Sequence, residues 1–468
     1  MYNTKYILFF FIISFVCSSC RKYVEIEPKG KVVPSEVRDY RLLLNNSGTL
    51  LNAIGMNEYG TDDISFLADV KQKAAVGGIA NNLYAWNTAI YNQDENDGEW
   101  NNLYKQIYVA NVVINGIPKA KPSNGVNADQ VLGEALVLRA ANYLYLINSY
   151  AKVYNPATAA TDDGVPLILL PDLEASLVRE DVQTVYSQIL TDLNAAVTLL
   201  TNPLGNRFFA SKASAYAFLA RTYLMMSDFE KANQNATASL ALINTLQDYN
   251  TLVTTTNGNL VVIPDNIVLN KDNIEIIQWR QAANGYGGFF LSDEVIGLYQ
   301  TGDIRKTLNT LPATIIAGMG GTMYNGEYNY NTATLRGKSV TRNVGPTVAE
   351  MMLIQAEYQA RSNNNPEAMK ILNGLRVKRF TPSTYVAITS SPNILKTVLD
   401  ERRRELLMRG ARWFDLRRFT KEPALAKVLV HQYADGGKFE LQPGSPKYVL
   451  PIPPNVIASS NEIKPNER

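Results

Sequence analysis

The strongest constraint on the fold is a helical hairpin pattern at residues 211–240, SKASAYAFLARTYLMMSDFEKANQNATASL. Small Ala220 lies three residues before bulky Tyr223, and a turn at Asp228 precedes the return helix. Small residues where two helices approach closely, with a bulky residue beside them, are typical of tetratricopeptide hairpins. The pattern recurs at residues 348–379. Spacing alone leaves a plain four-helix arrangement open as the alternative.

Helical periodicity extends through much of the rest of the chain. Further amphipathic helices are expected at residues 103–117, 133–150 and 181–200. Two long stretches at about residues 60–100 and 244–345 lack this periodicity but are rich in aromatic residues, which indicates functional loops rather than disordered linkers. We therefore expect one domain over residues 34–468. Its class is mostly α, with tetratricopeptide-like hairpins that carry long irregular ligand-binding loops.

Charge and histidine content exclude several classes of function. The chain carries 45 Lys and Arg against 43 Asp and Glu, so it has no single-sign field to attract nucleic acid. One histidine and two cysteines remove most zinc sites, iron-sulfur clusters and disulfide frameworks. We therefore expect no metal and no cofactor. Histidine-dependent catalysis would have to use His431, which follows the predicted helices and is expected at the surface.

The first residues have the features of an export signal. Lys5 precedes an apolar run over residues 6–16, which is too short to cross a bilayer about 30 Å thick at about 1.5 Å per residue. Residues 1–19 are therefore expected to be a signal peptide. Small residues directly before Cys20 resemble the lipobox of bacterial lipoproteins, in which the cysteine is acylated. Residues 20–33 would then be a lipidated tether; the alternative is a plain secretory signal that leaves Cys20 as a free thiol.

The run at residues 401–419, ERRRELLMRGARWFDLRRF, concentrates charges of both signs. Its arginines could clamp a phosphate or a carboxylate through bidentate contacts. Alternatively, Glu401 and Glu405 lie four residues apart on one helix face and pair with arginines on neighbouring turns. We favour this structural interpretation because the two signs are balanced.

The same charged run belongs to a set of segments that resembles the SusD/RagB family of Bacteroidetes outer-membrane lipoproteins. After about thirty residues it is followed by YVLPIPPNVIASSNEI, whose prolines predict an extended strap. Three earlier segments follow in the order of the family: GEALVLRAANYLYLINSYAKVY, SKASAYAFLARTYLMMSDFEKA and VAEMMLIQAEYQARSNNNPEAMKILNGLRVKR. Together with the lipobox, these segments span the chain.

The resemblance implies a fold of tetratricopeptide-like pairs whose irregular loops carry the ligand site. It also implies a partner, a SusC-type TonB-dependent transporter, to which a surface lipoprotein delivers captured nutrient without catalysing a reaction. The protein would touch the membrane through its lipid anchor only. The ligand of such proteins is usually a glycan and less often a peptide, so a peptide-binding relative is the second candidate. An exported enzyme is disfavoured by the scarcity of histidines, and a purely structural scaffold would leave the aromatic loops unexplained.

Aromatic side chains of the two loop stretches form the predicted ligand site. Sugars have apolar C–H faces ringed by hydroxyls, so a glycan site needs flat aromatic surfaces with amide or carboxylate partners. The first stretch offers Trp86, Tyr84 and Tyr91 near Asp62, Asp63 and Asn87, and the second offers Tyr286, Phe289 and Tyr324. We expect both stretches to converge on one face, although a loop aromatic more often fills a core. The carboxylates could equally bind calcium or serve a glycosidase, but no spacing singles out a catalytic pair.

Overall fold

The computed structural model describes most of the chain from residue 34 onward. The described residues are 34–65, 78–93, 95–201, 205–251, 255–257, 260–262, 273–282, 290–312, 328–330, 342–433 and 436–468. The predicted signal peptide, the tether of residues 20–33 and Cys20 lie outside these ranges, as do Tyr286, Phe289 and Tyr324.

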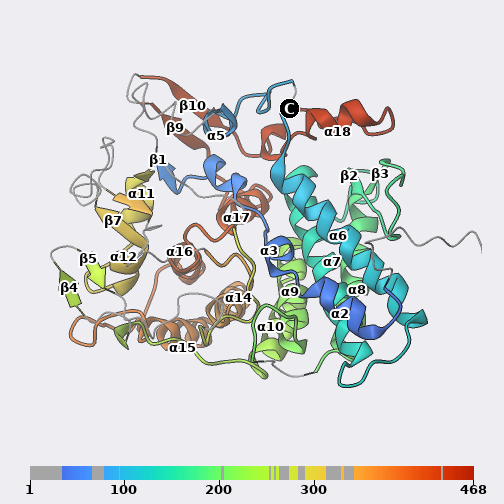
Figure 1. Cartoon of the computed structure of the whole chain (residues 1–468). Helices are drawn as coiled ribbons and strands as arrows, with labels where there is room; N and C mark the ends of the chain where they lie inside the picture. Colours follow the sequence, from blue (N-terminus) through green and yellow to red (C-terminus); the bar gives the residue numbers. More distant parts are fainter. Residues whose placement is uncertain are drawn as a thin grey trace, which may run out of the picture.

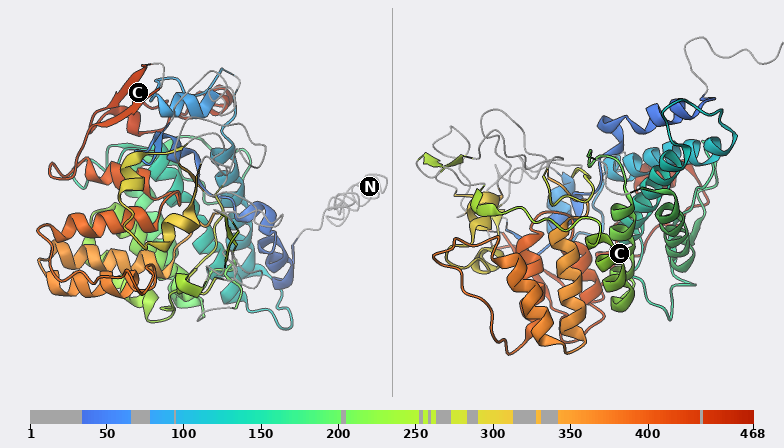
Figure 2. Two further views of the ribbon diagram at one scale, coloured as in Figure 1. Left: turned by 90° about the vertical axis from the view of Figure 1, so that its left-hand side faces the viewer. Right: turned by 90° about the horizontal axis from the view of Figure 1, so that it is seen from below.

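Long helices form the body of the protein (Figure 1, Figure 2). They are α6 (Gly98–Gly116), α7 (Ala128–Tyr150), α8 (Val182–Leu199), α9 (Lys212–Met225), α10 (Phe229–Leu240), α14 (Val348–Arg361), α15 (Asn365–Arg376) and α16 (Ile394–Glu405). Consecutive helices from α6 to α10 pack in pairs, α10 packs against α14, and α14 contacts both α15 and α16. The prediction of a mostly helical, tetratricopeptide-like fold is therefore confirmed.

The predicted hairpin forms as α9 and α10. Ser211 and Asp228 cap the N-termini of these two helices, because each side-chain oxygen accepts a hydrogen bond from a backbone N–H of the first turn. Ala220 of α9 is fully buried, as small residues are where helices approach closely. The Ser239 hydroxyl of α10 donates to the Ala213 carbonyl of α9 at 2.8 Å. The helices α14 and α15 pack as a second such pair.

Shorter elements connect and flank this array. The short helices are α2 (Val37–Leu44), α3 (Ser47–Leu50), α5 (Gly78–Tyr84), α11 (Asp293–Gly297), α12 (Ile304–Asn309), α17 (Arg412–Phe419) and α18 (Pro454–Ser459), with 3-10 turns η2 (Met56–Gly60), η3 (Ile117–Lys119), η4 (Tyr249–Thr251) and η6 (Pro446–Tyr448). The described strands form antiparallel two-stranded ribbons. These ribbons are β1 (Ile64–Ser65) with β6 (Phe290–Leu291), β2 (Asp163–Pro166) with β3 (Arg179–Asp181), β4 (Thr255–Asn257) with β5 (Leu260–Val262), β7 (Thr310–Pro312) with β8 (Tyr328–Tyr330), and β9 (Leu429–Gln432) with β10 (Lys438–Leu441).

The C-terminal segment runs back over the end of α7. The Leu450 N–H donates to the Ser149 carbonyl at 2.9 Å, and the Asn466 amide donates to the Tyr150 carbonyl at 2.8 Å. The predicted extended strap is correct for residues 449–453, since Tyr448 still belongs to η6. It is wrong beyond Pro453, because Pro454 begins α18, a position where a helix tolerates proline since the missing N–H would be unpaired there anyway.

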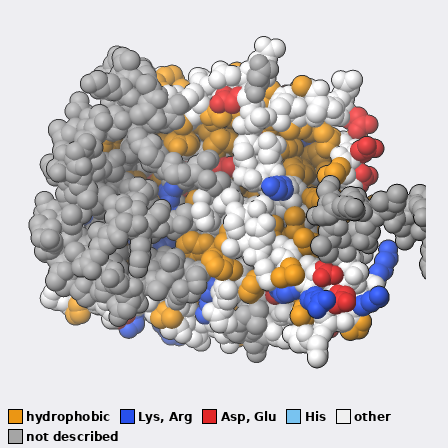
Figure 3. Space-filling model, in the orientation of Figure 1, with side chains coloured by type: hydrophobic (Ala, Val, Ile, Leu, Met, Phe, Trp, Pro, Cys, Tyr) orange, Lys and Arg blue, Asp and Glu red, His pale blue; other side chains and the backbone are white. Residues whose placement is uncertain are grey.

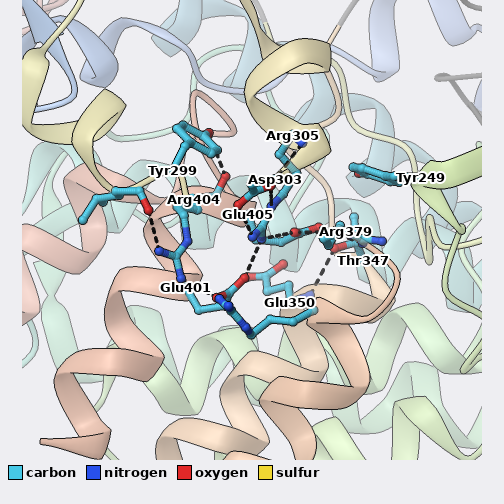
Figure 4. Close-up of polar contacts among 12 residues, drawn as sticks. Tyr249, Tyr299, Asp303, Arg305, Thr347, Glu350, Arg379, Glu401, Arg404 and Glu405 are labelled. Carbon is cyan, nitrogen blue, oxygen red and sulfur yellow. Dashed lines mark hydrogen bonds and ion pairs between the residues drawn. The ribbon is translucent and has the colours of Figure 1, made fainter. Parts of the chain in front are cut away.

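The charged C-terminal motif is a buried ionic network, as Figure 4 shows. Arg305 of α12 contacts Asp303, Glu401 and Glu405 at 2.6–2.9 Å. Arg379 contacts Glu405 at 2.8 Å and lies over the ring of Tyr249. The structural interpretation of this motif is therefore confirmed, although the partners of Glu401 and Glu405 include arginines distant in the sequence as well as one on the same helix.

The described surface carries charges of both signs, and neither sign forms a continuous patch on the face shown in Figure 3. Among the described residues, none of the helices combines the length and the apolar character that crossing a bilayer requires.

Candidate functional site

A cleft of about 630 Å³ opens where the two predicted loop stretches meet. Strand β1 of the first stretch pairs with β6 of the second, with Ile64 opposite Leu291. The Ser292 N–H extends this pairing by donating to the Asp63 carbonyl at 2.9 Å. The described parts of the two stretches therefore converge as expected. The cleft is lined by Asp62, Ile64, Ser65, Tyr84, Ser292, Glu294 and the continuous segment of residues 427–433.

Strand β9 supplies a long wall of this cleft. Its side chains alternate: Leu429 and His431 are buried, whereas Val430 and Gln432 are exposed. β9 pairs with β10 along one edge, and among the described strands no other pairs with it. An unpaired strand edge presents backbone N–H and C=O groups, so this wall can hydrogen-bond a ligand through its main chain as well as through side chains.

A group of ion pairs forms one end of the cleft. The Asp62 carboxylate accepts two hydrogen bonds from Arg412, both at 2.7 Å, and contacts the Lys427 ammonium at 2.5 Å. Lys427 also contacts Glu294 of α11 at 2.7 Å. Arg403 of α16 also belongs to this group, with contacts of 2.5 Å to Glu294 and 3.3 Å to Asp62. The charged C-terminal motif therefore reaches the cleft through its arginines.

The pKa values of the two neighbouring aspartates of this group, Asp62 and Asp63, are shifted in opposite directions. Burial raises the pKa of both carboxyls, but at Asp62 the guanidinium groups of Arg412 and Arg403 outweigh burial and hold the pKa well below its ordinary value. At Asp63 burial prevails and the pKa is raised, even though Arg403 donates to this carboxylate at 2.6 Å. Asp62 lines the cleft as a charged group, whereas Asp63 is fully buried beneath it.

The structure places Trp86 in the interior, so the prediction of a solvent-facing platform does not hold for this residue in this structure. The side chain is 2% exposed, its ring stacks on His431 at a centroid distance of 4.1 Å, and its indole N–H donates to the Gly60 carbonyl at 3.1 Å. Its backbone has a φ of 47°, a left-handed conformation that is uncommon for a bulky residue and persists only where the surroundings enforce it. Trp86 is an anchor behind the cleft.

The other predicted residues of the first stretch take different positions. Tyr84 lines the cleft, but its ring is buried and its hydroxyl donates to the Gln432 carbonyl. Tyr91 is a buried structural residue, because its hydroxyl donates at 2.5 Å to Asp97, the cap of α6. Asn87 is exposed, and its amide donates to Asn82. Neither Tyr91 nor Asn87 borders the cleft.

The prediction that His431 lies at the surface is wrong. The imidazole is buried, with one face on Tyr84 at a centroid distance of 4.0 Å and the other on Trp86. Its two ring nitrogens lie 2.7 Å from the Tyr84 carbonyl and 2.8 Å from the Thr61 carbonyl, so a neutral ring donates its single N–H to one of these carbonyls and only contacts the other. Burial lowers the pKa of His431 to about 4, which makes it a neutral structural group at pH 7.

A buried carboxyl behind the cleft gives a testable pH dependence. Glu58 accepts a hydrogen bond from the Gly410 N–H at 2.6 Å, and burial together with Asp63 raises its pKa to about 8. The folded chain thus binds more protons than the unfolded chain between about pH 4.5 and 8, so its stability falls as pH rises across this range. We expect a slope of about 1.4 kcal/mol per pH unit from this group, which Glu58→Gln removes.

Denaturation midpoints measured between about pH 5.5 and 7.5, inside this range, check this expectation. Glu367→Gln is the control, because Glu367 pairs with Lys370 at the surface of α15 and should keep the wild-type dependence. A Glu58→Gln chain that loses stability with rising pH as steeply as the wild type would contradict the assignment.

Among the described residues, no three His, Cys, Asp or Glu side chains are grouped so that they could hold a metal ion. The ligand-facing chemistry of the cleft consists of hydroxyl, amide, backbone and paired charged groups instead.

Several cleft residues escaped the sequence analysis. Glu294 and Lys427 are separated by more than 130 positions, and nothing in their local sequence indicates that they meet. Strand β9 was missed as well, although the alternation in Leu429, Val430, His431 and Gln432 is a signal that could have located it.

Comparison with known proteins identifies sequence families that match this chain. Residues 22–224 match a sequence family described as "Starch-binding associating with outer membrane", and residues 334–467 match the one described as "SusD family". SusD-like protein P38 of Formosa agariphila is 24% identical, with 89% of this chain and 91% of that protein aligned. SusD-like protein P25 of the same organism is also 24% identical, but over 48% of this chain and only 43% of that protein.

Solved structures share the fold. A SusD superfamily protein from Bacteroides thetaiotaomicron has a TM-score of 0.72 at 20% identity, covering 92% of this chain and 100% of its own. A putative sugar binding protein from Bacteroides vulgatus has a TM-score of 0.71 at 19% identity, covering 93% and 99%. A laminarin binding SusD-like protein has a TM-score of 0.64 at 20% identity, also covering 93% and 99%. The two family matches, which together cover most of the sequence, show that the chain belongs to the SusD/RagB family.

Proposed function

We propose that this chain is a lipid-anchored protein of the cell surface that captures a glycan in the cleft and delivers it to a SusC-type TonB-dependent transporter. The observation that carries the proposal is the cleft itself, a hollow of about 630 Å³ formed where both loop stretches meet on a SusD fold. Its volume lies within the range of about 300–1,000 Å³ found for small-molecule sites. The proposed role is binding and hand-over, with no reaction catalysed.

The chemistry of the lining supports a polyhydroxylated ligand. The hydroxyl of Ser65, the amide of Gln432 and the Glu294–Lys427 pair supply donors and acceptors for sugar hydroxyls. Tyr84 and Tyr433 are buried in this wall, and its exposed apolar surface comes from Val428 and Val430, which are 41% and 48% exposed. A SusD-like protein of the same fold that binds laminarin adds support for a glycan.

The proposed anchor rests on the sequence. The lipobox at Cys20 and the outer-membrane association of the family support acylation of this cysteine, which would hold the folded body at the membrane through residues 20–33. The transporter partner is proposed from the family resemblance.

A substitution that fills the cleft tests the proposal. Val430 lines the cleft and is 48% exposed, so Val430→Trp should occupy ligand space while leaving the core intact. Native gels containing laminarin, starch, xylan or mannan should show wild-type retardation by one of these polymers. Val430→Trp should lower that affinity at least about tenfold, a change of about 1.4 kcal/mol in binding free energy.

Val386→Trp is the matched control. Val386 is 75% exposed, does not line the cleft and should retain wild-type retardation. Equal retardation of Val430→Trp and the wild type would show that the glycan binds elsewhere.

The edge of β9 that no described strand pairs with, and where only the Tyr84 hydroxyl reaches the Gln432 carbonyl, favours a second candidate, an extended peptide. Such a ligand could add a strand beside Val430 and Gln432 and place charged side chains near Glu294 and Lys427. Two measurements separate the candidates. The first is the same set of four glycan gels, and the second is calorimetry with a peptide mixture. The peptide would be favoured if no polymer retards the wild-type chain, if calorimetry records binding heat with the peptide mixture, and if Val430→Trp abolishes that heat.

A further inference from the structure

The only charged side chains of the cleft that are substantially exposed within the described residues are Glu294 and Lys427. Their side chains are 54% and 37% exposed, whereas Asp62, Arg403 and Arg412 are nearly buried behind them. A ligand that enters the cleft therefore meets this pair first. Glu294 lies on α11 and Lys427 lies two residues before the start of β9, so the pair connects two walls of the cleft.

Glu294 uses one of its oxygens to hold two cations. Its Oε1 contacts the Lys427 ammonium at 2.7 Å and the Arg403 guanidinium at 2.5 Å. These neighbours lower the pKa of Glu294 despite partial burial, so the side chain is ionised at neutral pH. Its second oxygen, Oε2, has no partner among the described residues and remains an available acceptor.

Lys427 is in turn held between two carboxylates. Its ammonium contacts Glu294 at 2.7 Å and Asp62 at 2.5 Å. An ammonium has three donors, so one remains for a ligand. The pair thus offers one acceptor and one donor side by side, an arrangement that suits two adjacent hydroxyls of an uncharged sugar.

A carboxylate of a ligand meets different conditions at this point. To reach Lys427 it would have to approach the Glu294 carboxylate, which lies within hydrogen-bond distance of the same ammonium. Two anions this close repel, and Lys427 is already compensated by Asp62 and Glu294. The cleft therefore offers no uncompensated cation within the described residues to an anionic ligand.

We infer that Glu294 is a specificity-determining residue: by occupying Lys427 and Arg403 it makes the cleft accept uncharged glycans and reject glycans that carry carboxylates. This inference rests on the proposed glycan-capture function and names the class of glycan that the site takes. Without the Glu294 charge, Lys427 keeps only Asp62 as a carboxylate partner, and Asp62 also serves Arg412. The exposed end of the cleft then becomes positive.

The test compares one polymer in two charge states. The neutral glycan that retards the wild-type chain, chosen from laminarin, starch, xylan and mannan, is compared with its carboxymethyl derivative, which keeps the same backbone and adds carboxylates. At about 20 mM salt, where the Debye length exceeds about 20 Å, the wild type should prefer the parent polymer about tenfold. Glu294→Gln should shift the ratio of affinities about tenfold toward the derivative, and added salt to about 0.5 M should erase most of this shift.

Two further variants make the result specific. Glu367→Gln removes the same charge from the surface of α15, where Glu367 pairs with Lys370 outside the cleft, and should leave the ratio unchanged. Glu294→Gln combined with Lys427→Met removes the cation that the derivative needs, and should restore the preference for the parent. Circular dichroism spectra and melting temperatures of each variant are compared with those of the wild type to check that the variant folds.

The outcomes separate this inference from the proposed function. If no neutral polymer retards the wild-type chain, both the proposed glycan capture and the inference on Glu294 are contradicted. Wild-type chain that binds a polymer but prefers its carboxymethyl derivative would overturn the inference and leave glycan capture intact. A Glu294→Gln ratio within twofold of the wild type, or an equal shift in Glu367→Gln, would also overturn the inference.

Discussion

Replacement of Arg305 by leucine is expected to lower the free energy of unfolding by about 3–5 kcal/mol. The guanidinium is 1% exposed and contacts Asp303 at 2.7 Å, Glu401 at 2.6 Å and Glu405 at 2.9 Å. Although burial alone would raise the pKa of Glu405, the nearby Arg379 and Arg305 hold it at about 2. Leucine removes the shared cation and leaves carboxylates buried without full compensation, which costs more than the ion pairs themselves contribute.

Denaturant midpoints and slopes measure this effect. Lys396→Met is the matched control, because Lys396 also pairs with a carboxylate, Asp400, at 2.6 Å, but on the exposed side of α16. Its loss should change stability by no more than about 0.5 kcal/mol. Comparable losses in both variants would show that the buried network has no special weight. Arg305→Lys should recover only part of the stability, because an ammonium cannot reproduce the fork of the guanidinium.

Trp86→Ala is expected to destabilise the protein by about 3–5 kcal/mol, the usual cost of deleting a buried large aromatic side chain. The ring lies in a cluster with Trp413, Leu416, Leu429, Leu441 and Tyr448, and it covers one face of His431. Its removal opens a cavity and frees the segment that His431 fastens to β9. Any loss of ligand affinity in this variant would then follow from local unfolding of the cleft wall.

Thermal melting combined with the glycan gels separates the two roles of Trp86. Asn87→Ala is the neighbouring control; its side chain is exposed and its replacement should cost less than about 0.5 kcal/mol. If Trp86→Ala keeps the wild-type melting temperature and still loses glycan affinity, Trp86 is a binding platform after all, and the anchoring role is wrong.

The helical part of the fold was predictable because its signals are local. Ser211, Asp228 and the alanines of α9 and α10 lie within one hairpin, where capping and periodicity act over a few residues. The family motifs placed the remaining hairpins in order. The only helix in the C-terminal strap, α18, was missed because prolines were taken to exclude a helix, although proline is tolerated in its first turn.

The candidate site was less predictable because its contacts are distant in the sequence. Trp86 and His431 stack across 345 positions, so sequence composition could show an aromatic loop but not the partner that buries it. Glu294 and Lys427 likewise meet only through the tertiary fold. The predicted convergence of the two loop stretches is observed in their described parts, where Trp86, Tyr84 and Tyr91 are buried.

The hydrogen bonds between the C-terminal segment and α7 impose an order on biosynthesis. The carbonyls of Ser149 and Tyr150 receive Leu450 and Asn466 as partners, so the end of this central helix is completed by residues that are synthesised about 300 positions later. Contacts of such long range form late in folding. For a chain exported as proposed above, residues 450–466 must emerge from the translocation channel before these hydrogen bonds can form.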